Sequence, residues 1–149
     1  MAGFDETEFN EARLMIETAV LPFVIRRLTP AVQAEMRRLI EALRSHADEP
    51  MKADTDLMEF HLLMLRSCGN RVMEVFAMVV RTYFYSTKHL VENVSRDFFL
   101  ERADLFDHLL AALTAEDLPK AADVMRRIIL GNSALTAPAG EESGVKQAR

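Results

Sequence analysis

The clearest helix signal in this chain is Asp56-Leu57-Met58-Glu59-Phe60-His61-Leu62-Leu63-Met64-Leu65, which closes one residue later with Ser67-Cys68-Gly69-Asn70. Its apolar residues recur with the 3.6-residue period of a helix, and they place His61 in the row that faces the core. Gly69 can adopt the left-handed conformation that ends a helix, and Asn70 tolerates it. A histidine on so apolar a face needs a partner, which can be a metal, an anion or another side chain.

Five further helical segments surround this one. A helix over 7–27, with Thr7 as its cap, should be kinked at Pro22, and the next helix opens at Thr29-Pro30 with a cap and a first-turn proline. The stretch quoted above belongs to a helix over 54–68, and the other three helices are expected from 71 to about 94, between 97 and 114, and from 118 to 131. No segment alternates with strand period, so the sequence predicts an all-α antiparallel bundle of about six or seven helices.

Composition restricts the class of protein. The chain has 149 residues, which is enough for one domain with one hydrophobic core. Its net charge of -5 makes it a poor candidate for binding DNA or an anionic membrane. The single cysteine excludes an internal disulfide and is typical of a reducing compartment. Charges interrupt every apolar run and no signal peptide is visible, so we expect a soluble, cytoplasmic protein.

The chain divides into three parts by composition. We expect an N-terminal extension at 1–8, a helical domain at 9–131 and a flexible C-terminal tail at 132–149. The tail is small, polar and interrupted by glycine and proline, which disfavours a packed structure.

Three of the four histidines fall on separate expected helices, namely His61, His89 and His108. Imidazoles that converge from packed helices can bind zinc or a similar divalent ion. His108 stands in a row with leucine and alanine, so we expect it to face inward. The alternative is that one or two of these histidines lie on the surface or are satisfied in the core.

Arg13 and two tyrosines are further candidates for a binding site. Arg13 suits a carboxylate or phosphate, and the alternative is an i,i+4 ion pair with Glu17. Tyr83 and Tyr85 point to different sides of their helix, so at most one lines a given cavity, and core packing is the alternative role. The sequence shows no nucleophile–base–acid set, phosphate-binding glycine loop or CxxC pair, so we expect no enzymatic activity.

The succession of motifs resembles a known family. The motifs are Glu11-Ala12-Arg13 with Ile16-Glu17, Leu28-Thr29-Pro30, residues 56–61 with Gly69-Asn70, Asp107-His108-Leu109-Leu110-Ala111-Ala112-Leu113, Asp117 with Ala121, and Met125-Arg126-Arg127. In this order they resemble the effector-binding (FCD-type) domain of the FadR branch of GntR-family transcriptional regulators. The resemblance extends over roughly 9–130.

The resemblance implies a ligand-sensing domain that forms a homodimer. In the family this domain follows a winged helix-turn-helix that binds DNA, and the sequence before Phe9 is too short to contain one. We therefore expect DNA contact only through a missing N-terminal domain. The implied effector is a small carboxylate or an acyl-CoA-like thioester that would control DNA binding.

The resemblance also assigns candidate site residues. Many members hold a metal through an aspartate four residues before the first histidine, that histidine, a second in an Asp-His motif and a third on the last helix. His61 and His108 match, whereas the aspartate position is Leu57, with Asp56 out of register, and the last position is Ile128. Asp56, His61 and His108 thus form a degenerate metal set, for zinc if any. The chain looks closer to the acyl-CoA-responsive members, which lack the metal. The candidate effector-binding residues are Arg13, His61, Tyr83, Tyr85 and His108.

Two other functions compete with an effector domain. A metal-binding helical bundle of the carboxylate type would need Glu-x-x-His motifs, and the sequence contains none. A ligand-free dimerisation module would be favoured by a packed interior with no cavity near His61 and His108.

Overall fold

The structure is a computed structural model, and it describes residues 5–131 of the chain. Over this range the chain is all-α, as predicted, and contains no strand. The elements are α1 (Glu6–Ala19), α2 (Leu21–Arg27), α3 (Pro30–Ser45), α4 (Pro50–Ser67), α5 (Met73–Thr87), the 3-10 helix η1 (Lys88–Asn93), α6 (Arg96–Thr114) and α7 (Leu118–Gly131). The tail predicted at 132–149 lies outside the described residues. None of the described helices is long and apolar enough to cross a membrane.

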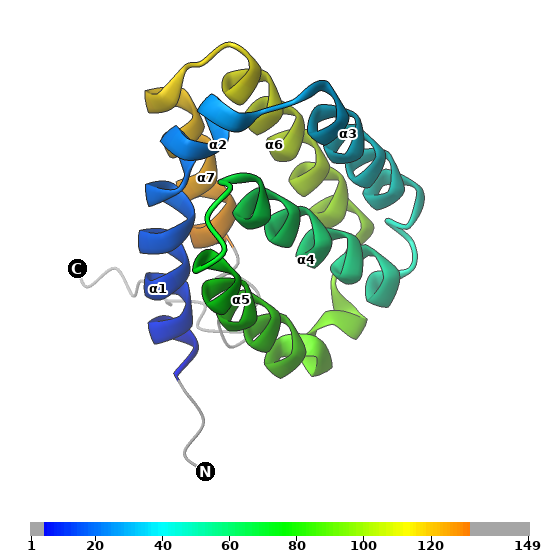
Figure 1. Ribbon diagram of the computed structural model, residues 1–149. Coiled ribbons are helices and arrows are strands. Elements are labelled where there is room, and N and C mark those ends of the chain that lie inside the picture. The colour runs from blue at the N-terminus through cyan, green and yellow to red at the C-terminus, as the bar shows by residue number, and fades with distance from the viewer. Residues whose placement is uncertain (1–4, 132–149) are drawn as a thin grey trace, which may run out of the picture.

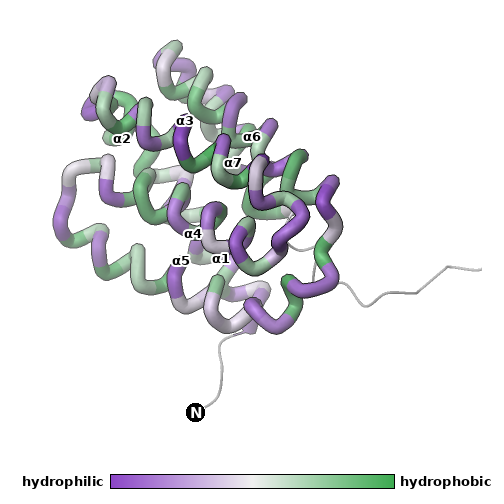
Figure 2. Tube along the Cα trace, turned by 90° about the vertical axis from the view of Figure 1, so that its right-hand side faces the viewer, coloured by the Kyte–Doolittle hydropathy of each residue, from purple (hydrophilic) through white to green (hydrophobic). Residues whose placement is uncertain are grey.

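Six of the helices close into a ring (Figure 1). In order around it, α1 packs against α5, α5 against α4, α4 against α3, α3 against α6, α6 against α7, and α7 against α1. The short α2 joins α1 to α3 and packs against α4 and α7. Apolar and polar stretches alternate along the helices (Figure 2), because one side of each helix faces the interior. Side chains from opposite members of the ring can therefore meet at its centre.

Local signals set most helix ends. Thr29 accepts a hydrogen bond from Val32 N at 3.2 Å, and Pro30 follows it as predicted. Gly69 has a φ of +73°, the left-handed conformation expected after α4, and Arg27 Nη1 donates to its carbonyl at 2.8 Å. The expected kink near Pro22 is a break between α1 and α2 at Val20.

Two predicted boundaries differ from the structure. Asp5, and not Thr7, caps α1, because Asp5 and Glu8 form a reciprocal capping box. Helix α1 therefore includes residues assigned to an N-terminal extension. Helix α4 begins at Pro50, earlier than the predicted 54, because Pro50 suits the first helical turn.

Helix α5 is apolar on both its inner and its outer side. Val80 and Tyr83 face the core, whereas Val75 and Phe76 are exposed, as is Val72 just before the helix begins. An uncovered apolar row therefore remains on α5.

Candidate functional site

Polar side chains occupy the centre of the ring. The buried polar residues among those described are Asn10, Arg13, Glu17, His61 and Arg102. The first three repeat at i, i+3 and i+7 on α1, so the core-facing stripe of this helix is polar. His61 comes from α4 and Arg102 from α6. Because buried charges are costly unless they are paired, this cluster calls for a specific set of partners.

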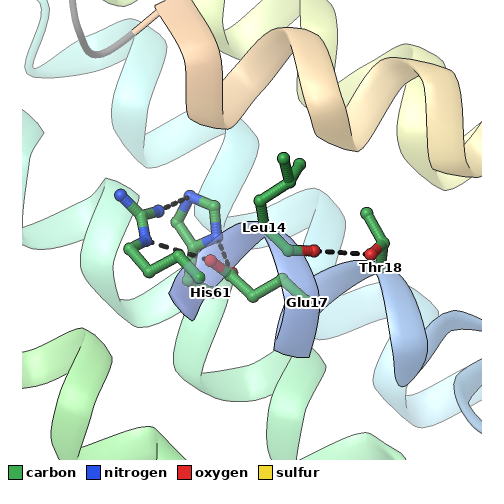
Figure 3. Close-up of polar contacts among 5 residues, drawn as sticks. Leu14, Glu17, Thr18 and His61 are labelled. Carbon is green, nitrogen blue, oxygen red and sulfur yellow. Dashed lines mark hydrogen bonds and ion pairs between the residues drawn. The ribbon is translucent and has the colours of Figure 1, made fainter. Parts of the chain in front are cut away.

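Arg13, Glu17 and His61 form a closed triangle of polar contacts. Arg13 Nε donates to Glu17 Oε2 at 3.0 Å, which confirms the i,i+4 pair considered from the sequence. His61 Nδ1 contacts Glu17 Oε1, and Figure 3 shows these two side chains facing each other. Arg13 Nη2 lies 3.3 Å from His61 Nε2. Since a guanidinium can only donate, the network assigns the proton of His61 to Nδ1 and leaves Nε2 as the acceptor.

Burial sets the charge state of this triangle. It lowers the pKa of His61, and although the contact with Glu17 acts to raise that pKa, the positive charges of Arg13 and Arg102 add to the lowering, so the imidazole is neutral near pH 7. Burial by itself would raise the pKa of Glu17, but contacts with His61 and Arg13 outweigh burial and keep that pKa below its usual value. The charged pair is thus Arg13 with Glu17, and His61 bridges them as a neutral group.

Aromatic rings enclose the triangle. The guanidinium carbon of Arg13 lies 4.6 Å from the centre of the Tyr83 ring and 5.3 Å from that of Phe84. Burial raises the pKa of Tyr83 and keeps the phenol protonated. The Phe106 ring is 5.5 Å from that of His61 and stacks on Phe60 at 4.0 Å. Tyr83 therefore lies at the cluster, and its role in effector binding stays a prediction.

The predicted inward position of His108 is wrong. His108 is exposed, and the α6 side chain that faces His61 is Phe106, two positions earlier. Two residues correspond to a rotation of about 200° around a helix, so only one of these two side chains can point to the core. Tyr85 is likewise 60% exposed on the outer side of α5, away from Arg13.

The residues proposed for a metal do not come together. Asp56 contacts His46 Nδ1 at 2.6 Å, and His108 is on the surface. Both ring nitrogens of His61 already have partners. Over the described part of the chain, no group of three or more His, Cys, Asp or Glu residues is placed to hold a metal ion. The residues present therefore do not fit a zinc site.

A small cavity adjoins the cluster between α4, α5, η1 and α6. Its free volume is about 20 Å³, which suffices for about one water molecule. Its wall consists of Glu6, Asp54, Leu57, Tyr83, Phe84, Thr87, Leu90, Val91, Val94, Phe98 and Phe99. Burial raises the pKa of Asp54 to about 6, although the charges of Lys88 and Arg13 act to lower it. An organic ligand needs a more open arrangement of these helices.

Sequence reasoning missed two charged residues near the centre, Asp54 and Arg102. Arg102 stands at i+3 from Phe99 and at i-4 from Phe106, two fully buried phenylalanines. A charged residue within such an apolar helical row was the available signal.

Comparisons with known proteins agree with this fold. The solved structure of E. coli McbR/YncC matches with a TM-score of 0.77 and 21% sequence identity, over 87% of this chain and 66% of that chain. A search of curated proteins finds no match. The family model of the FCD domain matches residues 8–131. The chain therefore belongs to the FCD domain family, as the motifs around Arg13 and His61 predicted.

Proposed function

We propose that this chain senses a small carboxylate or acyl-CoA-like effector and controls DNA binding by a linked N-terminal domain. The FCD family places it among effector-binding domains of GntR-family regulators, a regulatory class rather than a catalytic one. The observation that carries the proposal is the buried triangle of Arg13, Glu17 and His61. Arg13 Nη1 is buried in it and has no acceptor among residues 5–131.

An effector carboxylate would complete this network. It would accept a hydrogen bond from the spare Nη1 of Arg13, a charge-assisted contact of the stronger kind. The triangle joins α1 to α4, so a ligand that moves Arg13 also changes how these two helices pack. The ligand shifts the population toward the conformation that binds it more tightly.

Titration calorimetry tests this function. The panel comprises short and long carboxylates, one acyl-CoA, zinc chloride and a neutral amide. We expect a carboxylate or the acyl-CoA to bind. Binding should be lost in Arg13→Met/Glu17→Gln, which removes both charges together, and retained in the control Arg37→Met, which changes an exposed arginine on α3. A chain that binds no member of the panel would contradict the proposal.

The proposed homodimer uses the apolar face of α1 and α5. Met15, Val72, Val75 and Met78 are each 62–67% exposed, which is unusual for a monomer surface. Met78 lines two adjoining hollows on this face. One of them also contains Glu8 of α1, and the other contains Arg66, Arg71 and Arg81 with one carboxylate, Glu74, so its charge is positive on balance. A two-fold axis can bring the acidic side of one copy against the basic side of the other, so a second copy fits this face.

Sedimentation measures the oligomeric state directly. Wild type should sediment as a dimer, and Met78→Glu should sediment as a monomer because it places a charge in the centre of the apolar face. Ala31→Glu, at an exposed position of α3, serves as the control and should remain dimeric. A monomeric wild type at high protein concentration would refute this interface.

A ligand-free dimerisation module is the second candidate function. The observation that favours it is the small cavity, whose free volume of about 20 Å³ excludes an organic effector in this conformation. A stable dimer that binds nothing in the panel would select this alternative.

A further inference from the structure

A second hollow lies on the outer side of the ring. Helices α1 and α7 pack side by side (Figure 1), and the hollow is formed by the first turns of α1 together with Leu130 near the end of α7. Its free volume is about 370 Å³, within the range of about 300–1,000 Å³ that is typical of small-molecule sites. None of Arg13, Glu17 and His61 lines it, so it is separate from the triangle.

Two buried oxygen atoms at this hollow lack hydrogen-bond donors. Glu6 and Asn10 both line the hollow, and they stand four residues apart on α1, which makes them neighbours on one face of the helix. Glu6 Oε1 and Asn10 Oδ1 are buried, and neither has a partner among residues 5–131. Asn10 is only 8% exposed, so water reaches little of its side chain. Because a buried acceptor without a donor is costly, these oxygens favour a ligand that donates hydrogen bonds.

The wall of the hollow is acidic. Asp5, Glu6 and Glu11 contribute three carboxyl groups, and no lysine, arginine or histidine of the described chain lines the hollow. Asp5 Oδ1 also accepts a hydrogen bond from Thr7 N at 3.1 Å and so caps α1. The partial positive charge at the start of a helix is about half an elementary charge, which is less than the three carboxylates carry together. The hollow therefore favours a cation.

The remaining wall indicates an organic cation and not a metal ion. Leu14 and Leu130 line the hollow, and their side chains can cover an alkyl chain. Within residues 5–131, no three His, Cys, Asp or Glu side chains are placed to hold a metal ion. A primary ammonium has three N–H donors for the two buried oxygens, whereas a quaternary ammonium has none.

We propose that this hollow binds a primary alkylammonium ion. The N–H groups of the ligand donate to Glu6 Oε1 and Asn10 Oδ1, and the carboxylates of Glu6 and Glu11 offset its charge. Its alkyl chain lies against Leu14 and Leu130. This site takes a cation on the outer side of the ring, so it does not depend on an effector at the triangle.

Titrations followed by nuclear magnetic resonance test the class of ligand. Pentylamine is the proposed ligand, pentan-1-ol is its neutral analogue, trimethylpentylammonium has the charge without N–H groups, and calcium chloride supplies a metal ion. Pentylamine should shift the amide signals of residues 5–14 and 130 and bind at least about 10-fold more tightly than each other probe. Equal or tighter binding of another probe at these residues would overturn the proposal, as would no binding of pentylamine.

Variants test the two oxygens. Glu6→Gln should weaken pentylamine binding about 10-fold, and Asn10→Leu, which removes the amide oxygen, should weaken it by a similar factor. Glu41→Gln makes the same change in net charge at an exposed position of α3 and should bind like wild type. Circular dichroism confirms that each variant is folded. If Glu6→Gln and Asn10→Leu bind pentylamine as tightly as wild type, the site is refuted, while the effector-sensing function stands.

The stability of Asn10→Leu shows whether the amide oxygen already has a donor inside the protein. Arg13 Nη1, one turn along α1, is also buried and unpartnered, but no hydrogen bond joins it to Asn10 Oδ1 within the described chain. Because Asn10→Leu removes an unsatisfied polar atom, its urea midpoint without ligand should equal or exceed that of wild type. A clearly lower midpoint would indicate that Asn10 Oδ1 has an internal donor and would overturn the proposal.

Discussion

Asp54 should reduce the stability of the protein at neutral pH. Burial is the main reason that its pKa rises from 3.8 to about 6 on folding. The folded state therefore binds the proton more tightly than the unfolded state, and stability decreases as pH rises from about 4 to about 6. At about 1.4 kcal/mol per pH unit, the difference between these pKa values corresponds to about 3 kcal/mol lost above pH 6.

Asp54→Asn removes this titration. The variant should be more stable than wild type by about 3 kcal/mol at pH 7.5 and by only about 1 kcal/mol at pH 4.5, where Asp54 is protonated in the folded state. Urea unfolding followed by circular dichroism at the two pH values measures both differences. The neighbouring charge of Lys88 and the carboxyl of Glu6 are the same in both proteins. The difference in unfolding free energy between wild type and Asp54→Asn therefore reports on Asp54.

Asp56→Asn is the matched control on the same helix. Asp56 Oδ2 lies 2.6 Å from His46 Nδ1, so its replacement removes this carboxylate contact and should leave stability unchanged or lower it. The reasoning fails if Asp54→Asn gives no stabilisation at pH 7.5. It also fails if the gain is the same at both pH values, because a gain independent of pH would come from packing and not from the carboxyl proton.

Three further substitutions probe the triangle, the end of α4 and the metal prediction. Glu17→Gln leaves the buried charge of Arg13 without its counter-ion and should cost about 3 kcal/mol in urea unfolding, whereas Arg13→Met/Glu17→Gln should cost less; equal losses would contradict the pairing. Gly69→Ala imposes a side chain on a residue with a φ of +73° and should lower stability by about 1 kcal/mol or more, a loss that a thermal melt detects. His108→Ala should change stability by less than about 0.5 kcal/mol and leave zinc binding in calorimetry as in wild type, since His108 is exposed; a clear loss of zinc affinity would restore it as a ligand.

Much of the helical fold could be predicted because its signals are local. Thr29-Pro30 and Gly69 each determine a helix end through residues adjacent in sequence. The orientation of α5 could not be predicted in this way. Val72, Val75 and Val80 are all apolar, and only the packing of α5 against α1 and α4 decides which of them is covered. Hydrophobic periodicity identifies such a helix but does not determine its rotation.

The site shows the same limit more sharply. The sequence correctly predicted that His61 is buried. It left three kinds of partner open for this histidine, namely a metal, an anion or another side chain, and the structure shows the side chain of Glu17. The pair of Arg13 with Glu17 was available from i,i+4 spacing. The choice between His108 and Phe106 depends on the rotation of α6 relative to α4, a relation between distant segments. A single sequence contains no direct measure of that rotation.

The contact between Arg13 and His61 explains why a degenerate metal motif is compatible with a ligand-sensing interior. Arg13 Nη2 faces His61 Nε2, the ring nitrogen that would otherwise be free to ligate, and Glu17 holds the other nitrogen. A guanidinium remains charged at any physiological pH, so Arg13 provides a fixed positive charge beside the imidazole. An anionic effector would then contact the guanidinium of Arg13 in place of a bound metal ion. Leu57 and Ile128 stand where the family resemblance places the metal-binding aspartate and the last-helix histidine, so under the proposed function the positive charge that meets an anionic effector would come from Arg13 of α1.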